Sequence, residues 1–234
     1  MTQLAKASHT HDATAASPPT GEDPTKGQIR RSNETLILGA AEKVFARNGF
    51  SGATMAAIAE AAGLPKANLH YYFGSKQDLY HAVLARTLED WLMPLNAITP
   101  EADPAEAIAQ YIRAKMTLSA RRPHASKVFA NELLHGAPVV KNLLMTELRG
   151  MVQAKAAVID GWVAAGRMAP VDATHLFFSI WAATQTYADF DVQVGAVLGV
   201  QSLQEVHYTR ATEHVVALML RGCGLLSESK RIVI

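Results

Sequence analysis

Residues 54–76 read TMAAIAEAAGLPKANLHYYFGSK, and this stretch decides the fold class of the chain. Small and branched apolar side chains recur at helical spacing in its first part and predict a short helix with one packing face; they are Ala57, Ile58, Ala61 and Ala62. Gly63 follows, where glycine adopts left-handed backbone angles without steric cost, and Leu64 and Leu69 can close a small core behind the turn. Two short helices joined by such a turn form a helix-turn-helix, a unit that reads duplex DNA.

The second helix of this stretch carries side chains suited to DNA. A lysine ammonium binds phosphate or guanine, an asparagine amide pairs with an adenine edge, and tyrosine hydroxyls contact phosphates. Thr54 is predicted to cap the first helix, whose N-terminus can face a phosphate. The candidate DNA-binding residues are therefore Thr54, Lys66, Asn68, His70, Tyr71, Tyr72 and Lys76. The same pattern also fits an ordinary helical protein in which the aromatic run 71–73 packs in the core.

The charge of the chain is unevenly distributed. The net charge is only +1, but residues 26–78 contain seven basic and four acidic side chains, whereas residues 79–234 contain fourteen of each. Positive charge therefore concentrates on the helix-turn-helix, as neutralisation of phosphates and release of counterions require. Lys26, Arg30 and Arg31 can add phosphate contacts just before it.

The N-terminal part of the chain resembles the DNA-binding signature of TetR-family regulators. The residues in register are Ala40-Ala41, Phe45, Gly49-Phe50, Thr54, Ile58-Ala59, Ala62-Gly63, Leu69, Tyr72-Phe73, Ser75-Lys76 and Leu79. Two positions depart from the family pattern. Pro65 replaces a frequent serine cap, which removes a capping hydroxyl worth about 0.5–2 kcal/mol. His70 stands where a phosphate-contacting tyrosine is usual.

The sequence predicts three parts and an all-α fold. Residues 1–27 are rich in Ala, Thr, Ser, Pro and Gly and should form a disordered tail; residues 28–76 form the DNA-binding domain, and residues 77–234 a larger effector-binding and dimerisation domain. From residue 33 onward the pattern is helical, without strand alternation. The first predicted helix of the larger domain starts at Ser75 with Asp78 and runs to about Pro94. Two further helices start at Asp103-Pro104 and at Asp172, and another spans about Val140 to Ala165. The last helix starts at Ser202 with Glu205 and ends near Gly222.

Composition and motifs exclude several classes of protein. No apolar run reaches membrane-spanning length, and no hydrophobic signal core is present, so we expect a cytoplasmic protein that associates with the bacterial nucleoid and not with a membrane.

The single cysteine, Cys223, excludes an intrachain disulfide and a multi-thiolate metal site, and we expect it to be buried. His9 and His11 are better explained by a solvated tail than by metal binding. We expect no metal and no cofactor. Neither H-E-x-x-H nor G-x-S-x-G occurs, which argues against an enzyme.

The larger domain is longer than would be needed only to support the three-helix DNA-binding unit. One helix-turn-helix contacts few base pairs, and two of them about 34–36 Å apart read a palindrome, so the chain should bind double-stranded operator DNA as a homodimer. The helix after Asp172 is apolar nearly all round, which implies a second buried surface. The last two helices are therefore the candidate dimer interface.

The same helix carries a candidate ligand site. Trp181, Gln185 and Asp189 recur every four residues on one stripe, with Tyr187 nearby. A flat indole, an amide with both donor and acceptor, and a carboxylate together suit a small flat heterocycle with alternating C=O and N–H groups. The alternative is that Gln185 and Asp189 simply face solvent.

The larger domain also resembles the TetR-family regulators of pyrimidine use, in residues 91–95, 111–115, 132–138 and 180–190. For such regulators the ligand is uracil, with thymine a weaker analogue, and its binding releases operator DNA. The resemblance implies a repressor in which Trp181 encloses the ligand and Gln185 hydrogen-bonds to it, supported by Tyr187 and Asp189. The alternatives are a TetR-like regulator with another small or apolar effector, and a helical interaction module that binds a partner helix.

Overall fold

The computed structural model describes residues 24–226, and every element in that range is a helix. The elements are α1 (Pro24–Gly52), α2 (Met55–Ala62), α3 (Lys66–Phe73), α4 (Lys76–Leu92), η1 (Met93–Ala97), α5 (Pro104–Arg121), α6 (Pro123–Leu134), α7 (Lys141–Leu143), η2 (Leu144–Leu148), α8 (Arg149–Ala164), α9 (Ala173–Asp189), α10 (Asp191–Leu198) and α11 (Glu205–Gly222). The all-α prediction is confirmed. The predicted tail lies outside the described residues except at its end, where α1 already begins at Pro24.

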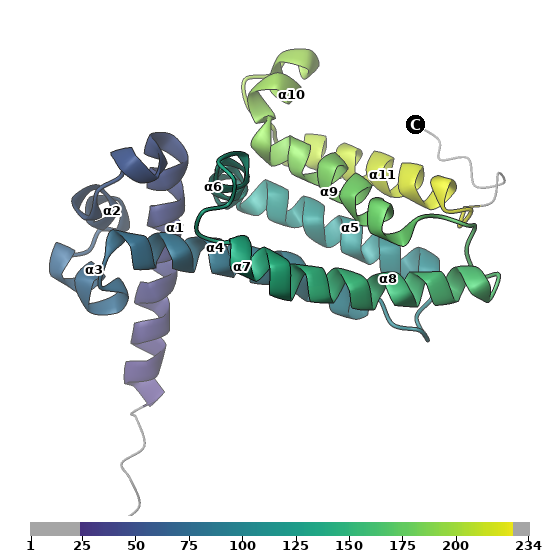
Figure 1. The fold of residues 1–234 in the computed structure, drawn as a ribbon. Coiled ribbons are helices and arrows are strands. Elements are labelled where there is room, and N and C mark those ends of the chain that lie inside the picture. Colours follow the sequence, from purple (N-terminus) through teal and green to yellow (C-terminus); the bar gives the residue numbers. More distant parts are fainter. Residues whose placement is uncertain (1–23, 227–234) are drawn as a thin grey trace, which may run out of the picture.

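The helices α1–α3 form one unit, which we call the head (Figure 1). Gly63 ends α2 in the left-handed region at φ 66°, as the sequence predicts, and Gly49 breaks α1 at the same φ before its last turn. The packing face of α2 differs slightly from the predicted one. Met55, Ile58 and Ala59 are its buried residues, whereas Ala61 is exposed, because α2 is rotated by about one residue relative to the predicted stripe.

The helix starts are mostly those predicted, because short polar side chains accept hydrogen bonds from otherwise unpaired amides. Thr54, Asp103 and Asp172 each accept from the backbone N–H three residues later, and Ser75 forms a capping box with Asp78. The cap predicted for the last helix was wrong. Its N-cap is Gln204, in a reciprocal pair with N3 residue His207, while the Ser202 hydroxyl accepts from the Gln204 amide.

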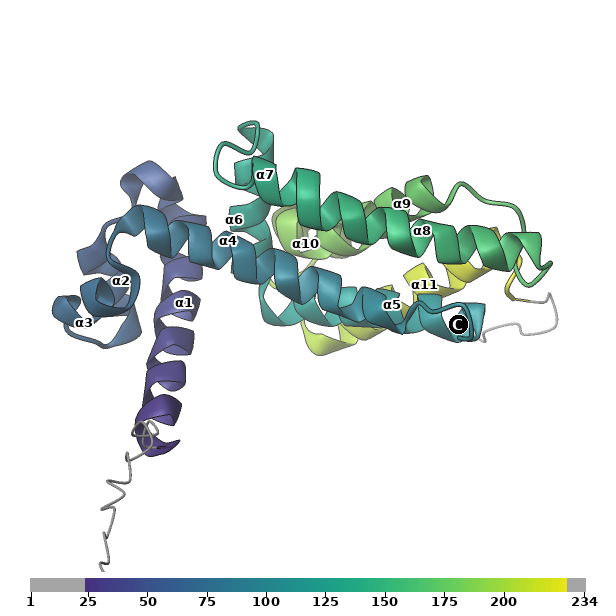
Figure 2. The ribbon, with the colours of Figure 1, turned by 60° about the horizontal axis from the view of Figure 1, so that its bottom comes forward.

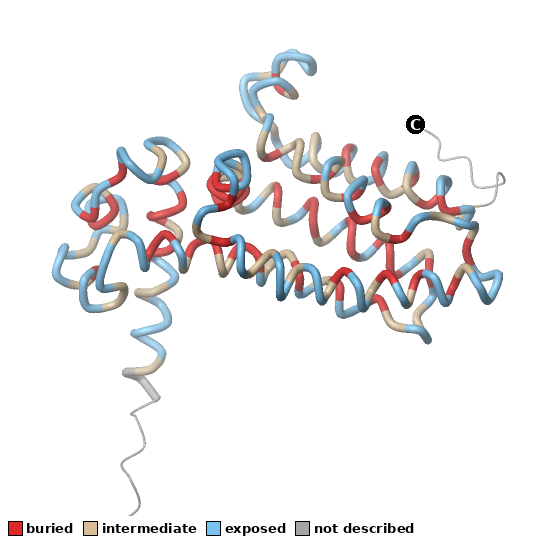
Figure 3. Tube along the Cα trace, viewed as in Figure 1, coloured by how far each residue is buried: buried red, intermediate tan, exposed pale blue. Residues whose placement is uncertain are grey.

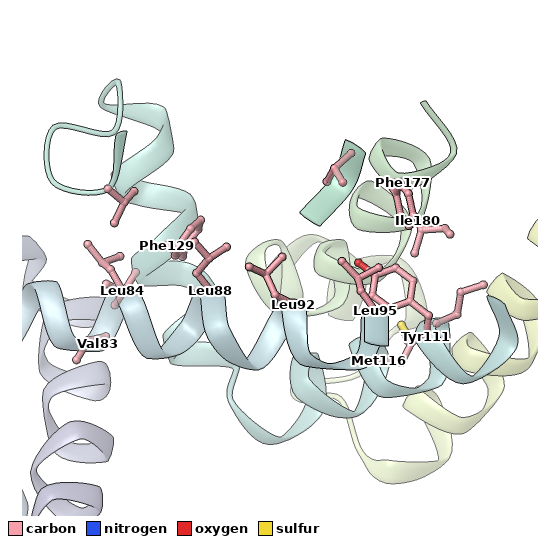
Figure 4. Packing of buried hydrophobic residues seen from close by; sticks show 14 of the residues in the cluster. Val83, Leu84, Leu88, Leu92, Leu95, Tyr111, Met116, Phe129, Phe177 and Ile180 are labelled. Atoms are coloured by element: carbon pink, nitrogen blue, oxygen red, sulfur yellow. The ribbon is translucent and has the colours of Figure 1, made fainter. Parts of the chain in front are cut away.

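The helices after α4 form the second unit, which we call the bundle. In Figures 1 and 2, α4 leaves the head and continues along the bundle, where α5, α8, α9 and α11 run side by side. Buried side chains of α4 and of the bundle helices meet in the bundle core. Figure 4 shows this for Leu84, Leu88 and Leu92 of α4 near the head, and for Tyr111 of α5 with Phe177 of α9 farther from the head. The predicted helix over about 140–165 is observed as α7, η2 and α8 in sequence, with a π-helical segment at Leu144–Leu148.

Two helices are placed differently from the rest. α6 lies between the head and the bundle, and it packs against α1, α4 and α9 (Figure 1). α10 stands off the bundle and is mostly exposed, as Figure 3 shows. Cys223 is buried, as expected. Within residues 24–226, no helix combines the length and the apolar character needed to cross a membrane.

Candidate functional site

The outer face of α3 carries the predicted DNA-reading residues. Lys66, His70 and Tyr71 are exposed and Asn68 is half-buried, while Leu69 on the opposite face is fully buried against the head core. Tyr71 is 77% exposed, which is unusual for an aromatic side chain and is typical of a contact surface. The structure thus places three of these four side chains on the outer surface of the head and Asn68 at its edge.

His70 has a defined hydrogen-bonding role. Its Nδ1 lies 2.9 Å from the carbonyl oxygen of Gly74. Because a carbonyl only accepts, Nδ1 carries a proton and donates to Gly74, which fixes the orientation of the ring.

Tyr72 is partly a structural residue. Its hydroxyl accepts a hydrogen bond from the Asn33 amide of α1 at 3.1 Å, and its ring meets that of Tyr71 edge-on with 5.2 Å between centroids. The hydroxyl proton remains available for a phosphate. Tyr72 and Phe73 both pack against the core, so the core alternative for the aromatic run holds for these two residues and not for Tyr71.

Lys76 and Thr54 hold the head together. The Lys76 ammonium donates to the carbonyls of Phe50 at 2.8 Å and of Ala53 at 3.0 Å, and lies 4.5 Å from the centroid of the Phe50 ring. Two of its three donors are therefore used to close the α1–α2 loop, and one remains for a phosphate. The Thr54 hydroxyl accepts from the Ala57 amide at 3.1 Å and caps α2.

In the bundle, the stripe of Trp181 and Asp189 faces inward. The Trp181 indole N–H donates to the Tyr111 hydroxyl at 2.7 Å, and the Asp189 carboxylate accepts from the Ser126 hydroxyl at 2.6 Å. Gln185 lies between them on the stripe and is half-buried; within the described part of the chain its amide makes no hydrogen bond. The stripe therefore contacts α5 and α6, and the solvent-facing alternative is wrong for Asp189.

Lys115 of α5 joins this cluster, although it was not among the residues predicted from the sequence. It is 2% exposed, and its Nζ lies 3.9 Å from the centroid of the Trp91 ring. Burial lowers the pKa of Lys115 to about 7, and the Asp189 carboxylate opposes this shift. Burial also raises the pKa of Asp189, against the opposing effects of Ser126 and Lys115. A lysine on the otherwise apolar stripe of Ile108, Tyr111 and Ile112 was the sequence signal for this site.

Tyr187 does not belong to this cluster. It faces α11, where its carbonyl accepts from the Tyr208 hydroxyl at 3.4 Å, and it lines a groove of about 1530 Å³ between α9, α10 and α11. Trp181, Gln185 and Asp189 do not line that groove. The structure thus brings three of the four predicted ligand residues to one side of α9 and places the fourth on another.

Comparison with known proteins identifies relatives of both units. Residues 37–83 match the family described as "Bacterial regulatory proteins, tetR family", and residues 84–226 match "YcdC-like protein, C-terminal region". The HTH-type transcriptional regulator RutR of Escherichia coli (strain K12) is 45% identical over 191 residues, which cover 82% of this chain and 90% of that protein.

Solved structures share the fold at low sequence identity. The ketosteroid transcriptional regulator KstR2 of Mycobacterium tuberculosis superposes with a TM-score of 0.64 at 17% identity, over 81% of this chain and 94% of that one. AibR in complex with isovaleryl coenzyme A and operator DNA superposes with a TM-score of 0.60 at 17% identity, over 80% and 97%. The relatives and the matched families are transcriptional regulators and not enzymes.

Proposed function

Because the chain belongs to the TetR family of ligand-responsive bacterial transcriptional regulators, we propose that it is a repressor that binds palindromic operator DNA as a dimer and releases it on binding a small pyrimidine such as uracil. The proposed DNA contacts are made mainly by Lys66, Asn68, His70 and Tyr71. Thr54, Tyr72 and Lys76, which also stabilise the head, add contacts to phosphates. Its place of action is the cytoplasm, where operator DNA lies.

One observation favours a pyrimidine over the other candidate effectors. Lys115 and Gln185 keep hydrogen-bonding groups without partners in the described structure, in an interior that also holds Trp181 and Asp189. No fully buried side-chain nitrogen or oxygen of the described residues lacks a hydrogen-bond partner, so these groups reach accessible space, where a ligand can complete the set. Uracil is flat and alternates C=O with N–H, which matches an ammonium, an amide and a carboxylate beside indole rings.

The proposed dimer interface is the surface of α9, α10 and α11. Exposed large apolar side chains gather on these helices, namely Phe178, Phe190, Val192, Val197, Leu198, Val206 and Leu218. Phe190, Val197, Leu198 and Val206 line one groove, and exposed apolar surface of this kind favours association, so that a second copy of the chain would cover it by two-fold symmetry. The groove lined by Tyr187 lies within this surface, which favours a partner chain over an apolar effector as its occupant.

α6 supports a mechanism for the release of DNA. On one side its Ser126 binds Asp189, the last residue of α9, and its Lys127 binds Asp191, the first residue of α10, with both oxygens of Asp191 at 2.8 Å from Nζ. On the other side, Arg122 at its start binds Glu42 of α1. A ligand beside Asp189 therefore acts on a helix that contacts the head directly, in addition to α4.

The proposed mechanism is a shift between two dimer conformations with different spacing of the heads. A tenfold weakening of DNA binding requires only about 1.4 kcal/mol of coupling between the two sites. Operator DNA must weaken uracil binding by the same factor, because coupling is reciprocal.

The test uses the full chain and an operator selected in vitro from random duplex DNA. Calorimetry with uracil should show binding, and uracil should weaken operator binding in fluorescence anisotropy. Gln185→Leu should abolish both uracil effects and leave operator binding unchanged, whereas Gln153→Leu, at an exposed position of α8, should behave as wild type. Loss of operator binding in Gln185→Leu would reject the assigned role, and absence of uracil binding by the wild type would favour a different effector.

A further inference from the structure

The N-terminal turns of α1 project from the head. In Figures 1 and 2 they continue beyond α2 and α3, and Figure 3 shows them as mostly exposed. The exposed residues are Gln28, Ile29, Arg30, Arg31 and Ser32. A helical segment that is exposed all round buries little apolar surface of its own, so a partner that covers one side of it would stabilise it.

Asn33 shows which side of α1 faces α3. Its amide donates to the Tyr72 hydroxyl at 3.1 Å. Since each residue of an α-helix turns about 100° and rises about 1.5 Å, Arg30 lies about 60° around the helix from Asn33, whereas Arg31 lies about 160° from it. Arg30 is therefore placed slightly less than one turn beyond the Tyr72 contact and on the same side of α1, while Arg31 is placed on the far side.

The projecting turns carry positive charge. Residues 24–33 contain three basic and no acidic residues. The Arg30 Nε donates to Glu34 Oε1 at 3.1 Å, and the arginine side chain is 60% exposed. A guanidinium presents N–H donors in a planar fork that matches phosphate oxygens. A cationic, polar helix segment that adjoins a DNA-reading face suits the DNA backbone better than it suits a second protein surface.

We propose that the N-terminal turns of α1 bind the sugar-phosphate backbone of operator DNA outside the groove that α3 enters, with Arg30 in contact with a phosphate beside Tyr72. This assignment rests on the proposed function and adds a second DNA-binding element to the head. The contact selects no base, because phosphates are the same in every sequence. The rise from Pro24 to Asn33 is about 14 Å, which equals about four base pairs of B-DNA, so the bound DNA should extend by up to that length at each end of the palindrome.

The experiment measures operator affinity at several salt concentrations between about 50 and 200 mM, by fluorescence anisotropy with the full chain and a duplex that extends well past the palindrome. Arg30→Gln should reduce the salt slope by about 1.8, at about 0.9 for each head of the dimer. Over this fourfold range of salt, wild type should thus lose roughly tenfold more affinity than Arg30→Gln. Arg30→Lys should keep most of the slope, because an ammonium still neutralises a phosphate.

Two further variants control for charge alone. Arg31→Gln removes the same charge from the far side of the same helix and should change the slope clearly less than Arg30→Gln does. Arg149→Gln, at an exposed position of α8, should bind operator as wild type does. Arg30→Gln should unfold at nearly the same urea concentration as wild type, because an exposed ion pair contributes little to stability.

Hydroxyl-radical footprinting locates the contact on the DNA. Wild type should protect backbone positions outside the palindrome, and Arg30→Gln should leave these positions open while protection inside the palindrome is unchanged. On a duplex trimmed to the palindrome itself, wild type and Arg30→Gln should bind with equal affinity, because the outer phosphates are missing.

Three results would overturn the assignment. They are an unchanged salt slope in Arg30→Gln, an equal loss of slope in Arg31→Gln, which would indicate a diffuse electrostatic effect, and outer protection that persists in Arg30→Gln. In each case the wild type still binds operator DNA and the proposed function stands. Failure of the wild type to select any palindromic duplex would instead reject the proposed function itself.

Discussion

Arg122 of the bundle lies 2.5 Å from Glu42 of α1, measured from Nη2 to Oε1, and so joins the effector unit to the DNA-binding head. Its Nη1 binds the carboxylate of Asp90 near the end of α4. The planar guanidinium offers parallel donors that bridge two carboxylates, which a lysine cannot do in the same geometry. Both carboxylates and the arginine are largely removed from solvent, so each depends on the other two.

Replacement of Arg122 should lower both stability and allosteric response. Arg122→Met leaves the buried Glu42 carboxylate and the part-buried Asp90 carboxylate without their partner, and we expect a loss of unfolding free energy of about 3 kcal/mol, the lower end for broken buried pairs. Arg122→Lys should lose less. Urea denaturation measures the stability, and operator anisotropy with and without uracil should show a smaller release than in wild type. Arg113→Met, which breaks the exposed pair with Glu106, should cost no more than about 1 kcal/mol. Equal stability of Arg122→Met and Arg113→Met would contradict the bridging role.

Tyr80 and Glu132 form a second connection to α6. The Tyr80 hydroxyl donates to Glu132 Oε2 at 3.1 Å, Glu132 Oε1 accepts from the amide of Val139 at 2.6 Å, and the Tyr80 ring packs on Phe45 of the head. Burial raises the pKa of Tyr80, so the hydroxyl remains a donor throughout the physiological range. Tyr80→Phe leaves a buried carboxylate oxygen without a donor and should destabilise the protein by about 1–3 kcal/mol.

The control for this change is Tyr71→Phe, at an exposed position of α3, which should leave stability unchanged in the same urea denaturation. Tyr71→Phe should instead weaken operator binding. The prediction for Tyr80 would be wrong if both variants unfolded at the same urea concentration as wild type.

Lys66 and Lys76 should separate DNA contact from head stability. Lys66→Ala removes an exposed cation from each head of the dimer and should reduce the salt slope of operator binding by about 1.8, at about 0.9 for each phosphate contact, without a change in stability. Lys76→Ala removes two hydrogen bonds from a charged donor to backbone carbonyls and should lower the free energy of unfolding by about 1.5–3 kcal/mol. Operator titrations at several salt concentrations and urea denaturation test both. A stable Lys76→Ala with a reduced salt slope would assign Lys76 to the DNA contact alone.

The proposed dimer interface predicts a monomeric variant. Val206 on α11 is 68% exposed and lines the groove between α9, α10 and α11. Val206→Asp places a charge where a second copy should pack, so sedimentation velocity should show a monomer, and affinity for a palindromic operator should fall because one head reads only a half-site. Leu134→Asp, an equally apolar and exposed position on α6, should remain dimeric. An unchanged oligomeric state in Val206→Asp would place the interface elsewhere.

Local sequence signals accounted for most of the fold. Gly63 ends α2 and Thr54, Ser75, Asp103 and Asp172 start helices because each effect depends on a side chain and amides within three residues of it. The last helix was mispredicted at its start because Ser202, Gln204 and Glu205 offer competing caps within four residues. The rotation of the α2 packing face likewise depended on α1, which periodicity alone does not position.

The sequence by itself determined that this chain is helical, that residues 54–76 form a helix-turn-helix and that Trp181, Gln185 and Asp189 share one stripe, because helical periodicity and capping act over a few residues. Only the tertiary structure decided which way that stripe faces, because this depends on α5 and α6, whose Tyr111 and Ser126 are more than sixty positions away from their partners. The tertiary structure also placed Tyr187 away from Trp181, Gln185 and Asp189 and placed Lys115 beside them. It showed that the Lys76 ammonium donates hydrogen bonds within the head. Each of these results comes from contacts between distant segments, and such contacts form only when the helices pack.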